Sequence, residues 1–261
     1  MAEIVQAIEY ITPLREGGSL PAIVGADDGQ LYVMKFAGAG QGPKALIAEW
    51  VAGEIGRALG LRVPRLVFME LDGAFGKSEP DPEIQDLLRA SVGLNLGMQY
   101  LPHATAFNPL LTPPPDPALA SDIVWFDAYV TNVDRTARNV NLLLWRAGLW
   151  LIDHGAALYF HHDWSADVLS RSRTPYARIK DHVLLPWATG LPEADVRARS
   201  RLSEDLLCGI VAAIPDAWLG RETAFSDAAE HRETYVRYLL NRLAAAPLFV
   251  EEAIRAQAKL V

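Results

Sequence analysis

The predicted fold is decided by two stretches of the second half of the chain, Asn132-Val-Asp-Arg-Thr-Ala-Arg-Asn139 and Leu149-Trp-Leu-Ile-Asp-His-Gly155. The first is a polar turn in which Asp134 and Asn139 stand five residues apart. That spacing allows one turn to carry both side chains into a single cavity. The second stretch places Asp153 directly after an apolar strand, where a carboxylate is costly unless a cation or hydrogen-bond donors lie beside it.

Two residues of the first half extend this pattern. Lys35 ends the apolar strand Tyr32-Val-Met-Lys35, and Glu49 lies in a helix predicted over residues 44–60. Phosphoryl transfer needs a lysine on the phosphate oxygens, a carboxylate that holds the lysine, an aspartate that receives the proton of the acceptor hydroxyl, and hard oxygen ligands for Mg²⁺. A strand lysine, a helix glutamate, a turn with Asp and Asn, and a final Asp follow the chain order of kinases. The sequence therefore predicts ATP-dependent phosphoryl transfer with Mg²⁺.

Each of these residues has an ordinary explanation when it is taken alone. Lys35 is typical of a lysine at a strand edge, and Glu49 of a solvated helix residue. The spacing between Asp134 and Asn139 can arise by composition. The prediction of chemistry therefore depends on the order of the groups within a coherent pattern of secondary structure.

The first part of the chain has the pattern of a β-rich lobe that contains one helix. Asp28-Gly29 is a strong hairpin signal between two predicted strands. The predicted elements are strands over residues 19–24 and 31–36, a helix over 44–60, and strands over 65–71 and 93–101.

The rest of the chain is mostly helical in pattern. We expect a proline-rich connection over residues 109–117, a helix over 119–131, a hairpin of 141–145 with 149–152, and helices over 193–213, 221–245 and 247–259. The sequence thus predicts an α+β, bilobal, protein-kinase-like fold. The predicted N-lobe covers residues 1–101, and the predicted C-lobe covers residues 102–261.

The composition is that of an ordinary globular protein and excludes several classes. The 261 residues carry 24 Lys+Arg and 32 Asp+Glu, for a formal net charge of −8. No nucleic-acid partner is expected, because phosphate neutralisation needs clustered cations. Cys208 is the only cysteine, so a disulfide framework and a Cys-based zinc site are excluded, and its apolar neighbours predict a buried thiol. Without a leader-like segment or a long apolar run, we expect a cytoplasmic protein with no membrane partner.

At these motifs the sequence resembles the HipA-like kinases, in particular a compact branch of that family. The resemblance runs over about residues 10–160 and is weak in the C-terminal helices. More distantly, the turn at 132–139 is similar to the catalytic loop of phosphoinositide kinases. The residues that carry the resemblance are Gly17-Gly18-Ser19, Asp28-Gly29, Tyr32-Val-Met-Lys-Phe36, Glu49, Leu59-Gly-Leu-Arg-Val-Pro64, Asn132-Val-Asp-Arg135, Asn139 and Ile152-Asp-His-Gly155.

The resemblance implies a bilobal atypical kinase fold, ATP and Mg²⁺ as cofactors, and a protein Ser/Thr hydroxyl as the acceptor. It also implies phosphate contact for Lys35, catalysis for Asp134, and metal ligation for Asn139 and Asp153. Glu49 matches the helix glutamate, with Glu54 five residues away on the same helix as a competitor. There are three departures: Thr136 stands where many members have His, the segment at 17–19 is shorter than the protein-kinase glycine loop, and His154 replaces the Phe of the protein-kinase Asp-Phe-Gly.

Two further segments are candidates for nucleotide binding. In Gly17-Gly18-Ser19, backbone N–H groups at Gly18 and the Ser19 hydroxyl can cap phosphates, although a plain turn before a strand is an equal alternative. Met98-Gln99-Tyr100-Leu101 occupies the expected hinge, where backbone groups of Gln99 and Leu101 can bind adenine. An ordinary lobe connection is compatible with that interpretation.

Two polar segments lie outside this constellation. His161-His162-Asp163 suggests a metal site, but adjacent side chains on an extended chain point apart, which favours surface positions. Residues 170–182 are locally basic, with Asp181 as the only acidic residue, and lie where an activation segment is expected. This segment can receive an acidic substrate, carry a phosphorylated residue, or be a solvated basic loop; the candidate hydroxyls are Ser170, Ser172 and Thr174.

Two alternatives to a protein Ser/Thr kinase remain open from the sequence. A small-molecule kinase of the aminoglycoside type uses the same constellation, and an acidic pocket built by the C-terminal helices would favour it. A nucleotide-binding pseudokinase that serves as an interaction module is the second, motivated by Thr136 and the short glycine segment. The expected partner is accordingly a protein substrate or a small-molecule hydroxyl acceptor.

Overall fold

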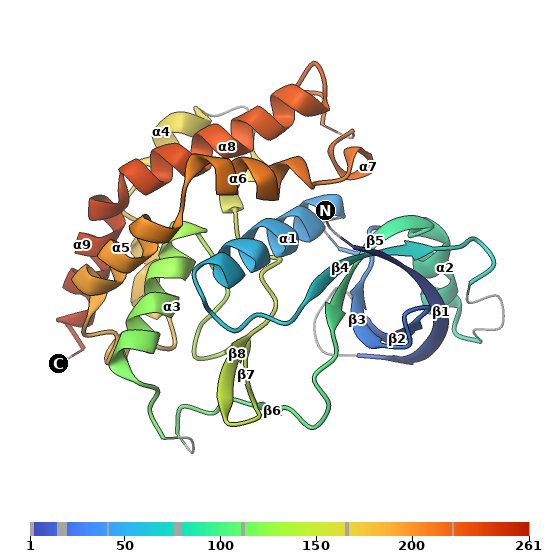
Figure 1. Cartoon of the computed structure of the whole chain (residues 1–261), viewed down its shortest axis with the longest axis horizontal. Helices are drawn as coiled ribbons and strands as arrows, with labels where there is room; N and C mark the ends of the chain where they lie inside the picture. The colour runs from blue at the N-terminus through green and yellow to red at the C-terminus, as the bar shows by residue number, and fades with distance from the viewer. Residues whose placement is uncertain are drawn as a thin grey trace.

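The computed structural model describes residues 3–14, 20–40, 42–75, 80–110, 113–164, 167–220 and 222–260. A β-barrel lies at one side of the molecule and a group of helices at the other, as Figure 1 shows. The barrel strands pair in the order β1 (Ile4–Pro13), β2 (Ala22–Ala26), β3 (Leu31–Lys35), β5 (Gly93–Gln99) and β4 (Leu66–Leu71). The α+β, bilobal architecture predicted from the sequence is thus present, while the boundary at residue 101 stays a prediction.

The hairpin of β2 and β3 forms at the predicted turn, where Gly29 has a φ of 75°. That backbone conformation is easily reached by glycine, which has no Cβ. Strand β1 and helix α2 (Pro82–Ala90) were not predicted. In β1 the pattern is blurred, because Ile4 and Ile8 are 59% and 64% exposed on the outer face while apolar residues also face inward.

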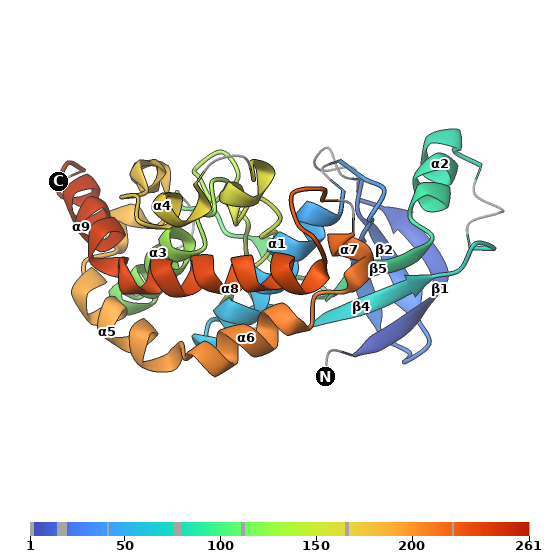
Figure 2. The ribbon, with the colours of Figure 1, turned by 90° about the horizontal axis from the view of Figure 1, so that it is seen from above.

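Helix α1 (Pro43–Ala58) runs between the barrel and the C-terminal helices, which Figure 2 shows from above. It is apolar nearly all round, as expected of a helix buried between two layers. Two indoles connect the layers: Trp50 Nε1 donates to Ile210 O at 3.0 Å, and Trp218 Nε1 donates to Leu94 O at 2.9 Å. Because α1 is fixed to both layers, any side chain that it directs toward β3 is held in a defined position.

The helical part begins with α3 (Pro117–Tyr129), and a second sheet lies beside it in the order β6, β7, β8. Its strands and helices are β6 (Thr105–Ala106), β7 (Leu142–Trp145), β8 (Gly148–Leu151), α4 (Val168–Ser172), α5 (Leu191–Arg201), α6 (Glu204–Ala212), α7 (Asp216–Leu219), α8 (Ala228–Ala244) and α9 (Ala246–Gln257). Short 3-10 helices are η1 (Tyr159–His162), η2 (Ala177–Asp181) and η3 (Leu185–Trp187).

Three expectations about this part are corrected. The helix expected over 193–213 is divided, because Leu202 is extended and the Ser203 hydroxyl caps α6 by accepting from Leu206 N. The helix expected from residue 221 begins at α8, where the Asp227 carboxylate accepts from Glu230 N. Cys208 is exposed rather than buried, because α6 turns Leu207, Ile210 and Val211 inward instead.

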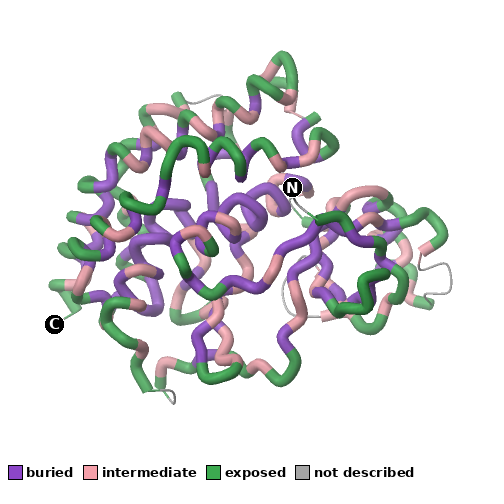
Figure 3. Tube along the Cα trace, in the orientation of Figure 1, coloured by how far each residue is buried: buried purple, intermediate pink, exposed green. Residues whose placement is uncertain are grey.

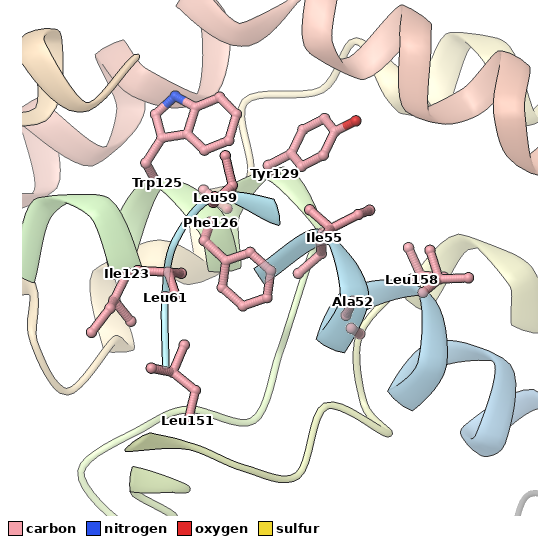
Figure 4. Packing of buried hydrophobic residues seen from close by; sticks show 14 of the residues in the cluster. Ala52, Ile55, Leu59, Leu61, Ile123, Trp125, Phe126, Tyr129, Leu151 and Leu158 are labelled. Atoms are coloured by element: carbon pink, nitrogen blue, oxygen red, sulfur yellow. The ribbon is translucent and has the colours of Figure 1, made fainter. Parts of the chain in front are cut away.

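The described residues form two hydrophobic clusters. The smaller fills the barrel and extends under α2, with Tyr32 and Met34 among its members. The larger joins the outer face of β4 and β5 to α1, α3 and the C-terminal helices. Figure 3 marks α1 and α3 as largely buried, and Figure 4 shows Ile55 of α1, Phe126 of α3 and Leu151 of β8 in this cluster. Helix α1 therefore shares its core with the helical part of the molecule.

Candidate active site

Lys35 is the centre of the site. Its Nζ lies 2.6 Å from Glu49 Oε2 and 2.6 Å from Asp153 Oδ1, so three residues from distant parts of the chain meet at one ammonium group. Burial alone lowers the pKa of Lys35, but the charges of Glu49 and Asp153 outweigh it and hold the pKa above its ordinary value. The lysine is therefore cationic at neutral pH.

Glu49 is fully buried on α1, with 0% of its side chain exposed. Its Oε1 lies 3.4 Å from Nδ1 of His154, which packs edge-on against Phe126. Burial raises the pKa of Glu49, but Lys35 and then His154 hold it well below its ordinary value. The competing Glu54 contacts Arg57 of its own helix at 3.4 Å, so the structure brings Glu49, and not Glu54, to the lysine.

Asp153 lies two residues beyond β8 in a left-handed backbone conformation, with a φ of 56°. Aspartate tolerates this conformation better than most residues because its short polar side chain bonds locally. Half of the side chain is exposed, compared with 13% for Lys35. One carboxylate oxygen binds Lys35, and the other accepts no hydrogen bond from a described residue.

Asp134 and Asn139 lie together, as the turn spacing predicted. Asn139 Nδ2 donates to Asp134 Oδ2 at 2.6 Å, and Asn141 Nδ2 lies 3.5 Å from the same oxygen. Burial raises the pKa of Asp134, and the negative charge of Asp153 raises it further against the hydrogen bond from Asn139. Asp134 and Asp153 are therefore close enough to repel each other electrostatically.

A cleft of about 520 Å³ runs from this constellation to the predicted hinge. Its wall includes Lys35, Asn139, Asn141 and Asp153 at one end and Gln99-Tyr100-Leu101 at the other. The Gln99 N–H donates to Arg65 O at 2.8 Å and is not free to bind adenine. Gly18 and Ser19 lie outside the described residues, although the flanking Leu14 and Pro21 line the cleft.

A second network, which was not predicted, lies behind the turn. The buried Asp127 carboxylate accepts from Arg135 Nε at 2.6 Å, His182 Nε2 at 2.9 Å and Asn132 Nδ2 at 2.8 Å. Arg135 also donates to the carbonyl oxygens of Asn141 and Ile152. Burial raises the pKa of Asp127, but Arg135 and His182 hold it well below its ordinary value. A lone carboxylate within the apolar stretch 123–130 is the sequence signal that could have revealed it.

A smaller pocket of about 270 Å³ is lined in part by Val133 of the turn, and we name it the arginine pocket. Its wall includes Val133, Tyr159, Arg171, Tyr176, Arg178 and Tyr238. The Tyr176 hydroxyl donates to Asn132 O, and Val183 N donates to Arg135 O at 3.2 Å. The segment expected to be an activation segment is thus bonded to the turn that carries Asp134.

The expectation of surface positions for His161 and His162 is wrong for His161, which is fully buried. The chain is wound into η1 here rather than extended, and His161 Nδ1 lies 2.9 Å from the Tyr235 hydroxyl. Burial holds the pKa of His161 well below its ordinary value, so the imidazole is neutral. Among the described residues, no group of three or more His, Cys, Asp or Glu side chains is suited to hold a metal ion, and no helix is long and apolar enough to cross a membrane.

The HipA-like kinase model matches residues 7–251, nearly the whole chain. This chain belongs to the HipA-like kinase family. The match extends past the stretch on which the resemblance was based and includes the C-terminal helices. The site geometry thus lies in a member of a kinase family, and the chain is a phosphotransferase by that membership.

Solved structures show the fold of this HipA-like kinase. The proinflammatory kinase CtkA of Helicobacter pylori matches with a TM-score of 0.60 and 16% identity, over 95% of this chain and 96% of CtkA. Two structures of the Golgi casein kinase, one with Mn/ADP bound, match with TM-scores of 0.49 and 0.48 and identities of 12% and 13%, over 96% of this chain and 73% and 72% of theirs. No curated protein matches the chain. The likeness to CtkA shows a kinase fold.

Proposed function

We propose that this HipA-like kinase transfers the γ-phosphate of ATP to a Ser or Thr hydroxyl of a protein substrate. The observation that carries the proposal is Lys35, which bridges Glu49 and Asp153 at 2.6 Å each in the wall of a cleft that leads to the hinge. A largely buried ammonium held in place by two carboxylates still has its third N–H donor for a phosphate oxygen. Adenine occupies the hinge end of the cleft beside Leu101.

The residues present fit a divalent cation that is shared with phosphate. Mg²⁺ typically uses one or two protein carboxylates together with phosphate oxygens and water, so a larger protein cage is unnecessary. One Asp153 carboxylate oxygen accepts no hydrogen bond from a described residue. Asn139 donates its amide N–H to Asp134, so its amide oxygen remains available as a ligand. These two residues would hold the ion, which would supply charge neutralisation of the phosphates.

Asp134 is the residue that receives the proton in the proposed reaction. The acceptor oxygen attacks the γ-phosphorus, the bond from phosphorus to the bridging oxygen of ADP breaks, and the hydroxyl proton passes to the Asp134 carboxylate. The hydrogen bond from Asn139 orients that carboxylate. Thr136 supports this arrangement, because its hydroxyl accepts from Asn139 N at 3.3 Å and closes the turn.

The arginine pocket favours a protein acceptor over an aminoglycoside. Aminoglycosides are polycations, and their recognition requires carboxylates near the catalytic loop. The described wall of this pocket carries Arg171 and Arg178 and no carboxylate. A cationic surface beside Asp134 repels such a substrate, whereas a peptide can present acidic or neutral side chains.

The test is transfer from γ-labelled ATP with Mg²⁺, to the protein itself and to a mixture of Ser- and Thr-containing peptides. We expect labelling by the wild type and its loss in Asp134→Ala and Asp153→Ala. Asp205→Ala is the matched control, because Asp205 is an exposed carboxylate in the first turn of α6. Stabilisation by ATP without any transfer would indicate a pseudokinase, and no stabilisation by any nucleotide would refute the proposal.

A further inference from the structure

The arginine pocket is lined in part by the turn that carries Asp134. Val133 in its wall precedes Asp134 directly, and consecutive Cα atoms are about 3.8 Å apart. Another part of the wall comes from residues 171–178, which begin in the last turn of α4. An extended peptide advances about 3.3–3.6 Å per residue, so a peptide with its hydroxyl at Asp134 can place a side chain a few residues away into this pocket.

The wall of the pocket is held in a fixed shape. The buried Arg242 donates to Ser172 O at 3.0 Å and to Thr174 O at 2.8 Å, and it also donates to Tyr129 O and Ala128 O from the end of α3. A binding surface that is ordered before the ligand arrives avoids the entropic cost of ordering on binding. The segment is therefore a preformed surface and not a loose basic loop.

The positive charge in this pocket is not neutralised within the described chain. Arg171 donates to the carbonyl oxygens of Phe160 and Asp163, at 3.2 and 2.9 Å, which position the guanidinium without cancelling its charge. Arg178 is exposed and makes no hydrogen bond or ion pair with a described residue. Such an arginine offers its planar fork to an incoming carboxylate or phosphate.

From this geometry we infer that the arginine pocket selects protein substrates with an acidic side chain, Asp or Glu, a few residues from the phosphorylated Ser or Thr. The inference rests on the proposed function and names its substrate class. Arg178 supplies the main charge contact, and Arg171 supplies a second, pre-oriented one. Tyr159 and Tyr176 provide aromatic walls for the aliphatic part of the acidic side chain.

Occupation of the pocket by a phosphorylated residue of the same segment is less well supported. Ser172 is fully buried, and its hydroxyl donates to Leu169 O at 2.6 Å, so no kinase can reach it in the folded chain. Thr174 lines the pocket, but its hydroxyl donates to Arg171 O at 2.9 Å. An external carboxylate needs neither of these bonds to be broken.

The experiment uses a library of Ser-centred peptides in which one flanking position at a time is fixed as Glu, Gln or Lys. Initial rates of transfer from γ-labelled ATP are compared for the wild type, Arg178→Glu, Arg178→Gln and the control Arg237→Glu. Arg237 is an exposed arginine of α8 that does not line the pocket. The readouts are the rate ratios of Glu to Gln peptides and of Glu to Lys peptides within each protein, so any general loss of activity cancels.

We expect the wild type to phosphorylate Glu peptides about tenfold faster than Gln peptides at one or two neighbouring positions, as one charge-assisted bond predicts. Arg178→Gln should lose this preference, Arg178→Glu should prefer Lys peptides, and Arg237→Glu should match the wild type. A wild type without a Glu preference, or a preference that persists in both Arg178 variants, overturns the inference while leaving the kinase proposal intact.

If no peptide is phosphorylated, a binding measurement tests the arginine pocket separately from the proposed phosphoryl transfer. Fluorescein-labelled Glu and Lys peptides are then titrated with each protein, and binding is followed by anisotropy. Tighter binding of the Glu peptide that is lost in both Arg178 variants supports the pocket although the transfer proposal has failed. Equal binding of both peptides overturns the inference as well.

Discussion

Two carboxylate–cation networks adjoin the turn at 132–139, and they differ in how fully their carboxylates are hydrogen-bonded. In the cleft, Lys35 joins Glu49 to Asp153, and half of the Asp153 side chain is exposed. Behind the turn, Asp127 is fully buried and its carboxylate accepts from Arg135, His182 and Asn132. We name the first group, together with Asp134 and Asn139, the cleft network, and the second group the rear network.

The same chemistry serves two purposes in these networks. Both hold a buried carboxylate as an anion, since the pKa values of Glu49 and Asp127 lie well below their ordinary values. The cleft network keeps one oxygen of Asp153 uncommitted, whereas the rear network uses its carboxylate for three bonds. An ion pair with spare, exposed bonding capacity on its carboxylate is suited to bind a ligand, and one whose carboxylate is fully hydrogen-bonded is suited to fix the backbone.

The two networks are connected through Arg135. Its side chain reaches from Asp127 to the carbonyl oxygens of Asn141 and Ile152, and these residues adjoin the cleft. The rear network therefore positions the two segments that deliver Asn139 and Asp153. Substitutions in the two networks should separate activity from stability.

The largest effect is expected for Asp153→Asn in the cleft network. Removal of one charge from the proposed metal ligand should lower phosphoryl transfer by at least about 1000-fold, or about 4 kcal/mol of transition-state stabilisation. The free energy of unfolding should change by less than about 1 kcal/mol, because the side chain is half exposed. Labelled-ATP transfer and urea denaturation measure the two quantities. More than a tenth of wild-type activity would contradict this role.

The second effect is a loss of stability in the rear network. Asp127→Asn leaves the buried Arg135 guanidinium without its counter-charge and should lower the free energy of unfolding by about 3 kcal/mol in urea denaturation. Asp122→Asn is the matched control: Asp122 pairs with Arg197 at 2.7 Å, but both side chains are a third or more exposed. That exposed pair should contribute less than about 1 kcal/mol. Equal losses in the two variants would show that burial of the rear network does not matter.

The third effect is a loss of stability at low pH. The folded-state pKa values of Glu49 and Asp127 lie below their ordinary values of 4.5 and 3.8, so the unfolded chain takes up protons first as the pH falls. The stabilisation is complete above these ordinary values and is lost as the pH decreases below them, by about 2 kcal/mol. The midpoint temperature of thermal unfolding should fall steeply as the pH decreases across this range in the wild type. It should fall less steeply in both Glu49→Gln and Asp127→Asn. If the pH dependence of Asp127→Asn equals that of the wild type, groups other than Asp127 cause the acid sensitivity.

The sequence predicted the cleft network because its members stand at recognisable places. Lys35 ends a strand, Asp153 follows one, and the turn between them holds Asp134 and Asn139 at a fixed spacing. The order of these groups along the chain is independent of tertiary detail, which is why the α+β, bilobal fold was also predictable. Glu49 could not be separated from Glu54 by sequence, because only the packing of α1 decides which of them faces β3.

The rear network and the arginine pocket could not be predicted from the sequence, for a physical reason. Asp127 and His182 are 55 residues apart, and neither lies at the end of a strand or in a recognisable turn. Burial of His161 likewise depends on the short 3-10 helix η1, whereas the sequence predicted an extended chain over residues 161–163. Contacts that depend on how helices pack against one another leave little local signal.

The smallest effect is expected at Thr136, where the two networks meet. Its N–H donates to Asn139 O at 2.9 Å, its hydroxyl accepts from Asn139 N, and its backbone pairs with His182. Thr136→Ala removes only the hydroxyl and should reduce transfer about three- to fivefold, equivalent to about 1 kcal/mol. Thr136→Ser keeps the hydroxyl and should retain wild-type activity. If Thr136→Ala lowers the free energy of unfolding as much as Asp127→Asn does, the turn belongs to the rear network; if it lowers activity alone, the turn serves the cleft.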